Sequence, residues 1–424
     1  MLRLRMWIWL YGCLTWTLLG VAFCALPLLN LIKPKFAKWF RMRFWPRPLD
    51  FQPQFWMHAV SMGEIKIARA VLDDFFKMEM APDNFLITCA TQQGYHSLIE
   101  AFGRERVRYL PWDARLCYRR LFGNKQVPNL IVVETEIWPV LFSYVREQGA
   151  DLVVINGRLG SKTMRISRNP LFRKALAQAS FIAARGDADR ERYLAFGVEP
   201  ERVTVTGNIK FDFEPKKVTD PTFLTWLEDE QPLLVFASIS TDEVDLLAPA
   251  VAEILAMEEG PRILWAPRHL KDLEIHRQAL ASHGATLRSE LDQNSGGKLL
   301  ILDSFGELSG CYPYALLSLV GGSFNRRGGQ NFLESLQAGA PALMGPFTEN
   351  FQREVKEALQ EQTIEIIAEP GLVGKSMADL VRDPERLQAM SERARTYLAR
   401  HAGAIARTRK VLIDLDVFTR KYRS

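Results

Sequence analysis

Short apolar runs alternate with amphipathic helical patterns along most of the chain, and the alternation stops once and then restarts. Before the interruption the apolar runs include FWMHAV, NFLITCA, LIVVE, DLVVI and RVTVTG, and after it they include LLVFAS, RILWAP, LLILD, ALLSLVGG and PALMG. Apolar runs of this length between helices predict βαβ units in a mostly parallel, doubly wound sheet. The interruption at Asp212–Phe223 is polar, contains two prolines and lacks periodicity, so it predicts a linker. We therefore expect two α/β domains, over residues 49–214 and 222–424.

Two Rossmann-like domains of this kind are expected to face a central cleft, because ligands of such sheets bind at the carboxyl ends of the strands. The sequence contains no GxxxxGK[ST], GxGxxG, HExxH or GxSxG motif. Phosphate-loop hydrolysis, dinucleotide redox chemistry, zinc proteolysis and lipase chemistry thus lack their usual signatures. The five cysteines are scattered without a CxxC pair, and no DxD-like pair of carboxylates stands at the expected pocket, so neither a disulfide framework nor a metal is expected.

The positive charge of the chain is concentrated at its start. The formal net charge is +5, but residues 1–50 hold eight Lys or Arg against one acid, so the remainder is slightly acidic. A nucleic-acid enzyme is expected to carry its basic surface on the folded body. We therefore expect no nucleic-acid partner.

The first 48 residues have the composition of a membrane anchor followed by a basic arm. Residues 6–32 contain no charged side chain and are long enough to cross a hydrocarbon core of about 30 Å. A cleaved signal peptide is the competing interpretation, and Pro27 and Asn30 leave a shallower interfacial helix open. The six bases in residues 33–47 then predict a body on the cytoplasmic face and contact with anionic membrane lipids.

Three motifs in the first domain carry candidate chemistry. In HAVSMGE, Ser61 lies in a turn and Glu64 opens a helix, where a carboxylate is either a general base or, more commonly, a partner of the helix dipole. In ETEIWP, Glu134 and Glu136 point to one side at the end of a buried strand, so a structural salt bridge and a functional role are equally supported. In TGNIKFD, Lys210 precedes the linker and would reach an anion, although such a lysine is usually a solvated charge.

The strongest motif lies in the second domain, in LLSLVGGSFNRRGGQNFLE. A buried strand runs into Gly321–Ser323, and a second glycine pair precedes a helix expected to begin near Asn331. Glycines allow close approach to a phosphate, and a helix N-terminus supplies donors to it. Asn331 and Glu334 lie one turn apart, where a carboxylate can accept ribose hydroxyls. This pattern indicates a nucleotide pocket more than an idle turn.

A second strand end in this domain, LWAPRHL, carries Arg268 and His269. Arginine makes bidentate contacts with phosphate, and the end of a parallel strand is where a phosphate would be bound. A surface arginine beside a hydrogen-bonded histidine is the competing interpretation.

Together these stretches resemble one family. HAVSMGE, ETEIWP, INGRL, TGNIKFD, APRH, DSFGEL, GGS, GGQNFLE and GPFTENF are similar, in this order, to motifs of the 3-deoxy-D-manno-octulosonic acid (Kdo) transferases. These are GT-B glycosyltransferases that move Kdo from CMP-Kdo onto lipid A precursors in lipopolysaccharide core biosynthesis. The resemblance implies an inverting transferase at the inner membrane, with CMP-Kdo and a lipid A precursor as its partners and no cofactor.

The resemblance also implies roles for individual residues. It assigns the catalytic base to Glu64 and acceptor-side positions to Ser61, Glu134 and Glu136. It implies donor contacts by Arg268, His269, Gly306, Glu307, Leu308, Gly322, Ser323, Asn331, Glu334 and Lys210. One departure is Gln330, where the family usually has His; Gln can donate a hydrogen bond but cannot carry a proton. A GT-B enzyme or epimerase that uses a UDP-sugar, and a non-catalytic membrane scaffold, are the alternative functions.

Overall fold

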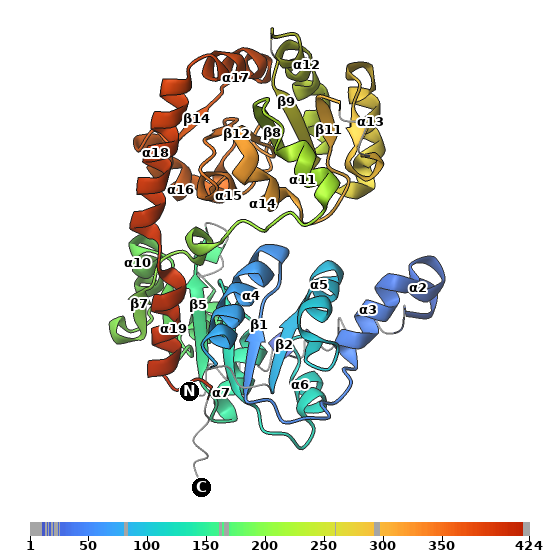
Figure 1. The fold of residues 1–424 in the computed structure, drawn as a ribbon. Helices are drawn as coiled ribbons and strands as arrows, with labels where there is room; N and C mark the ends of the chain where they lie inside the picture. Colours follow the sequence, from blue (N-terminus) through green and yellow to red (C-terminus); the bar gives the residue numbers. More distant parts are fainter. Residues whose placement is uncertain are drawn as a thin grey trace. The chain divides into compact units, whose positions relative to one another are not determined.

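The computed structural model describes residues 26–418 except 80–83, 161–162, 165–168, 259 and 292–296, together with residues 11, 12, 15, 17, 20 and 24. It contains two compact units. The first comprises Met1–Asp212 and Gly403–Ser424, and the second comprises Phe213–Ala402. Each unit holds one seven-stranded sheet whose paired strands are all parallel, which confirms the predicted α/β class with two Rossmann-like domains (Figure 1). The expected central cleft stays a prediction.

The sheet of the first unit has the strand order β3-β2-β1-β4-β5-β6-β7. Its strands are β1 (Phe55–His58), β2 (Phe85–Cys89), β3 (Val107–Tyr109), β4 (Asn129–Val133), β5 (Leu152–Gly157), β6 (Phe181–Ala184) and β7 (Val203–Val205). Its helices include α4 (Met62–Lys77), α5 (Gln92–Phe102), α6 (Arg115–Phe122), α7 (Pro139–Glu147), α9 (Pro170–Leu176) and α10 (Asp187–Ala195). The order reverses between β1 and β4, which makes their carboxyl ends the expected ligand position of this unit.

The strand register of the first unit places large side chains in one core. Trp56 of β1 stands beside Leu86 of β2 and Leu130 of β4, and all three are fully buried. The Trp56 indole N–H donates to Thr88 Oγ1 at 2.8 Å, so its single polar atom is satisfied inside the core.

The sheet of the second unit has the strand order β10-β11-β9-β8-β12-β13-β14. Its strands are β8 (Leu233–Ile239), β9 (Arg262–Pro267), β10 (Thr286–Leu287), β11 (Leu299–Ile301), β12 (Ala315–Val320), β13 (Ala342–Met344) and β14 (Ile364–Ile366). Its helices are α11 (Pro221–Leu227), α12 (Val244–Leu255), α13 (Leu273–Leu280), α14 (Leu308–Cys311), α15 (Leu333–Gln337), α16 (Gln352–Gln360), α17 (Val373–Val381) and α18 (Pro384–His401). Here the reversal falls between β8 and β12, so the glycine loop after β12 lies at the corresponding position.

The C-terminal segment differs from the predicted domain boundary. We expected residues 222–424 to form one domain, but α19 (Ala404–Asp414) packs in the first unit, against α4 (Figure 1). The Asp212 carboxylate accepts hydrogen bonds from the Gly403 and Ile405 amides at 2.7 and 2.6 Å. Arg409 Nη1 donates to both carboxylate oxygens of Asp74 at 2.7 Å. These contacts join residues far apart in sequence, so local periodicity did not show to which unit the last helix belongs.

The expected anchor over residues 6–32 lies mostly outside the described residues. Within the part that the structure describes, no helix has both the length and the apolar character needed to cross a membrane. The described helices of this region are α2 (Leu26–Ile32) and α3 (Pro34–Phe44). One of the six predicted lipid-contacting bases, Arg43, is buried. Its Nε donates to the Leu110 carbonyl at 2.8 Å and its guanidinium lies over the Trp112 ring, so it fastens α3 to the first unit.

Candidate active site

Glu64 lies in the first turn of α4, directly after β1. Ser61 caps this helix, because its hydroxyl accepts a hydrogen bond from the Glu64 amide at 3.3 Å. The Glu64 carboxylate accepts in return from the Ser61 hydroxyl at 2.9 Å and from the Val60 amide at 2.6 Å. The side chain is 7% exposed. The carboxylate therefore lies at the helix N-terminus, as the helix-dipole interpretation expected, and is held at the strand reversal.

The pKa of Glu64 is raised to about 7. Burial is the main cause, the charges of Glu134 and Glu136 add to it, and the Val60 hydrogen bond opposes it. Burial and the Glu134 charge also raise the pKa of Glu136. The structure thus brings together three carboxylates predicted from two separate motifs. A carboxyl group with a pKa near neutral pH is suited to general base catalysis.

Glu134 is held differently from the other two carboxylates. Burial acts to raise its pKa, but the Lys210 ammonium, with Nζ at 3.0 Å from Oε1, lowers it overall. Its backbone has a φ of 58°, in the left-handed region that costs a non-glycine residue energy. Lys210, for which we expected a donor contact, pairs with Glu134 of its own unit. This charge pair keeps one carboxylate ionised beside Glu64.

The glycine loop of the second unit is organised around Glu243, a residue not predicted from the sequence. Glu243 is fully buried, and its carboxylate accepts from the amides of Gly322, Ser323 and Phe324 at 2.7 to 3.0 Å. The Ser323 hydroxyl donates to the Val320 carbonyl at 2.6 Å and accepts from the Gly345 amide at 2.8 Å. The loop amides therefore bind a carboxylate of the fold, which differs from the expectation that they stand open to a phosphate.

Asn331, Glu334 and Arg268 lie close together in the second unit. The helix α15 begins at Leu333 and spans five residues, so Asn331 precedes it instead of starting it. The Asn331 amide donates to Glu334 Oε1 at 3.1 Å, while its Oδ1 is buried without a hydrogen-bond partner among the described residues. Desolvation lowers the pKa of Arg268, and the Glu334 carboxylate opposes this shift. The Arg268 guanidinium can bind a phosphate, and Asn331 Oδ1 can accept a hydrogen bond, so the two suit a ligand that has both a phosphate and hydrogen-bond donors.

The other predicted donor residues lie in two neighbouring loops. The Glu307 carboxylate accepts hydrogen bonds from the Ser304 hydroxyl and from Arg288 Nη2, the second at 3.3 Å. On either side of it, Gly306 is exposed with a φ of 88°, and Leu308 is the first residue of α14. His269 is exposed, and desolvation and the Arg268 charge lower its pKa. Gln330 lies against Gly322, where an added Cβ would meet its Nε2 at 2.9 Å. Among the described residues no group of three or more His, Cys, Asp or Glu is arranged to hold a metal ion.

The sequence shares its motifs with named proteins. Residues 38–213 match the family described as 3-deoxy-D-manno-octulosonic-acid transferase (kdotransferase). A 3-deoxy-D-manno-octulosonic acid transferase of Bordetella pertussis is 29% identical over 381 residues, which cover 87% of this chain and 88% of that protein. A protein of the same name from Haemophilus influenzae is 26% identical over 424 residues, covering 97% of this chain and 98% of that protein. Over most of its length the chain is similar to Kdo transferases.

The chain also shares its fold with a more distant solved structure. The complex of S. aureus MnaA with UDP matches with a TM-score of 0.57 at 14% identity, covering 87% of this chain and 98% of that one. A likeness at this identity shows the fold alone, which is two Rossmann-like units with parallel sheets.

Two candidate residues of the second unit were missed in the sequence. Glu243 follows Ser240 by three residues, and the two form a capping box around the turn Thr241–Glu243. The SxxE spacing is a readable local signal for that box. The second, Arg288, bonds Glu307 and also lies 3.3 Å from Asp220. No local pattern marks Arg288, because its partners are distant in sequence.

Proposed function

We propose that the protein is an inverting glycosyltransferase that transfers Kdo from CMP-Kdo to a lipid A precursor. The observation that carries this proposal is the Glu64 carboxyl, buried at the strand reversal of the first unit with a pKa of about 7. Sequence similarity supports the reaction class, since the similar proteins bear the name of Kdo transferase.

In the proposed reaction Glu64 removes the proton from the acceptor hydroxyl. The hydroxyl oxygen then forms the new bond to the anomeric carbon of Kdo on the face opposite the phosphate, and the bond from that carbon to the phosphate oxygen breaks. CMP leaves with the electron pair of this bond. Its developing charge needs a cation, and we assign this role to Arg268.

The Lys210–Glu134 pair has a supporting role in this scheme. An ionised Glu134 raises the pKa of Glu64 and so strengthens it as a base. Lys210 keeps Glu134 ionised. We assign the pair to the acceptor side, because both members belong to the first unit and lie 3.0 Å apart.

We further propose that the protein works at the cytoplasmic face of the inner membrane, where its lipid acceptor resides. Leu31 and Ile32 are exposed at the end of α2, and the exposed Lys33 and Lys35 follow them directly. Apolar side chains beside lysines suit an anionic lipid surface. If residues 6–32 also anchor the chain, a high-salt wash should leave the protein in the membrane fraction, because salt screens the lysines only.

Mass spectrometry of reaction products tests the proposed reaction. The purified protein is incubated with CMP-Kdo and a tetra-acylated lipid A precursor, and we expect a product heavier by one or more Kdo units together with released CMP. UDP-N-acetylglucosamine replaces CMP-Kdo in a parallel reaction to test the UDP-sugar alternative. Turnover of the UDP-sugar without turnover of CMP-Kdo would reject the proposed donor.

A further inference from the structure

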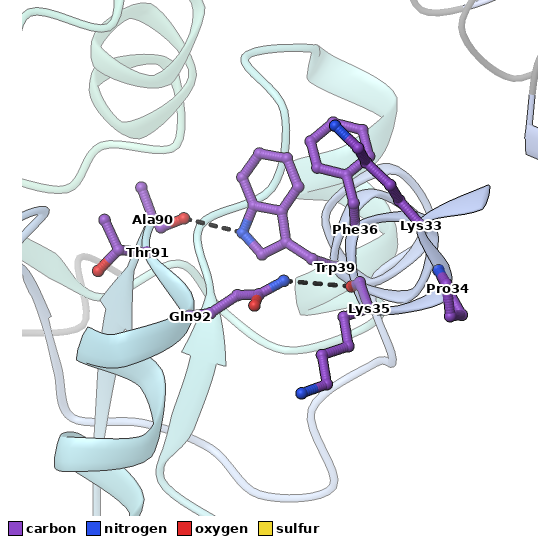
Figure 2. Close-up of a pocket in the computed structure, with 8 residues that line it drawn as sticks. All are labelled: Lys33, Pro34, Lys35, Phe36, Trp39, Ala90, Thr91 and Gln92. Carbon is purple, nitrogen blue, oxygen red and sulfur yellow. Dashed lines mark hydrogen bonds between the residues drawn. The ribbon is translucent and has the colours of Figure 1, made fainter. Parts of the chain in front are cut away.

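A pocket of about 710 Å³ lies between the N-terminal helix α3 and the turn that follows strand β2 (Figure 2). Phe36 and Trp39 form its aromatic wall, with ring centroids 5.2 Å apart. Lys33 and Lys35 line it from the same segment, and Thr91 and Gln92 line it from the other side. Its volume is in the range of small-ligand sites. The pocket combines an apolar wall with two exposed cations.

Hydrogen bonds from both sides hold this pocket in place. The Trp39 indole N–H donates to the Ala90 carbonyl at 2.9 Å, and the Gln92 amide donates to the Lys35 carbonyl at 3.1 Å (Figure 2). The buried Arg43 fixes the other end of α3. The arm is therefore docked on the first unit, and the pocket belongs to the structure of that unit.

The pocket is a direct neighbour of the Glu64 loop. Strand β2 pairs in parallel with β1, so the turns after both strands lie at one edge of the sheet. The Thr91 hydroxyl donates to the Val60 carbonyl at 3.4 Å. The Val60 amide in turn donates to the Glu64 carboxylate at 2.6 Å. One residue, Val60, thus separates the pocket lining from the proposed base.

We propose that this pocket receives an acyl chain of the acceptor lipid while its sugar hydroxyl reaches Glu64. The proposal rests on the proposed function. The aromatic wall matches a hydrocarbon chain, and Lys33 and Lys35 match the phosphate groups of an anionic lipid. Among the eight lining residues there is no acidic side chain that would repel such a lipid. The acyl chain thereby fixes the distance between the membrane surface and the reacting hydroxyl.

A kinetic comparison of two acceptors tests the proposal. Phe36→Ser removes part of the apolar wall at a side chain that is 42% exposed, so the fold is expected to tolerate it. We expect the KM for the tetra-acylated precursor to rise about tenfold, with the KM for the deacylated precursor and for CMP-Kdo unchanged. The matched control is Ile413→Ser, which alters a 40% exposed side chain of α19. An unchanged KM for the acylated precursor, or an equal rise for both acceptors, would overturn the proposal.

A crosslinking measurement keeps this test independent of turnover. A tetra-acylated precursor with a photoreactive diazirine in one acyl chain is irradiated with the wild-type protein in detergent micelles, and the labelled peptide is identified by mass spectrometry. We expect the label on the peptides that contain Phe36 and Trp39, competed by unlabelled precursor but not by phosphatidylglycerol. Labelling elsewhere, or equal competition by phosphatidylglycerol, would reject the pocket as the acyl-chain site whether or not Kdo is transferred. Correct labelling without transfer would instead reject the proposed function alone.

Discussion

Replacing Glu243 by glutamine tests how the glycine loop of the second unit is held. The buried carboxylate accepts from the amides of Gly322, Ser323 and Phe324 across the strand reversal. It also accepts from the amide and the hydroxyl of Ser240, at 3.0 and 2.5 Å. Glutamine has nearly the same shape but carries no charge, and one of its two oxygens becomes an NH₂ group that donates.

The expected cost follows from counting the amides that lose their acceptor. Oε1 serves the Ser323 and Phe324 amides, and Oε2 serves the Ser240 and Gly322 amides, so either orientation of the glutamine leaves two backbone donors facing a donor. A hydrogen bond to a charged group contributes about 1.5–3 kcal/mol, so the second unit should lose about 3–6 kcal/mol. Small domains are stabilised by about 5–15 kcal/mol, so the variant should remain folded in mild conditions.

Urea unfolding and calorimetric titration with CMP measure the two consequences for Glu243→Gln. We expect a lower urea midpoint and a CMP affinity reduced about tenfold or more, because the loop positions Gln330 and the strand end beside it. Glu258→Gln, at an exposed position of the same unit, serves as the control. A Glu243→Gln protein with the wild-type midpoint and the wild-type CMP affinity would refute this account of the loop.

Three further predictions concern charged side chains. Arg268→Ala should weaken CMP binding about tenfold to a hundredfold in calorimetric titration, since a charge-assisted contact is worth about 1.5–3 kcal/mol; wild-type affinity would place the phosphate elsewhere. Lys210→Met should lower kcat about tenfold, or about 1.4 kcal/mol, while the CMP affinity stays unchanged. A loss of CMP affinity in that variant would instead support the donor contact expected from the sequence. Arg409→Ala removes a two-oxygen contact with Asp74 and should lower the unfolding free energy of the first unit by about 1–2 kcal/mol in urea; an unchanged midpoint would show that α19 docks without it.

Local patterns predicted the elements that depend on neighbouring residues. The apolar runs gave both parallel sheets, because a strand buried on both faces reads as a continuous apolar segment. The local pattern placed Glu64 at a helix start after a strand, but its assignment as the base came from the family resemblance. The proximity of Glu64 to Glu134 and Glu136 was not predicted, because it depends on the pairing of β1 with β4.

Long-range contacts explain what the sequence did not reveal. The capping box of Glu243 is local, but the loop whose amides donate hydrogen bonds to the Glu243 carboxylate is about eighty residues away in sequence. The place of α19 depends on Asp212 and Asp74, which no periodicity connects to it. The sequence predicted Arg43 as one of six lipid-contacting bases. Its burial depends on Leu110 and Trp112, which are about seventy residues away in sequence.

The pH dependence of Kdo transfer by the wild type and by Glu64→Gln tests the central claim most directly. The raised pKa means that Glu64 is protonated and inactive as a base below about pH 7 and ionised above it. The wild-type kcat/KM for the acceptor should therefore fall as the pH drops through about 7. Glu64→Gln should transfer Kdo at least about a hundredfold more slowly, and its kcat/KM should not fall as the pH drops through about 7. It should bind CMP as the wild type does. Near-normal transfer by Glu64→Gln, or the same fall of kcat/KM near pH 7 in this variant, would contradict the assignment of Glu64 as the catalytic base.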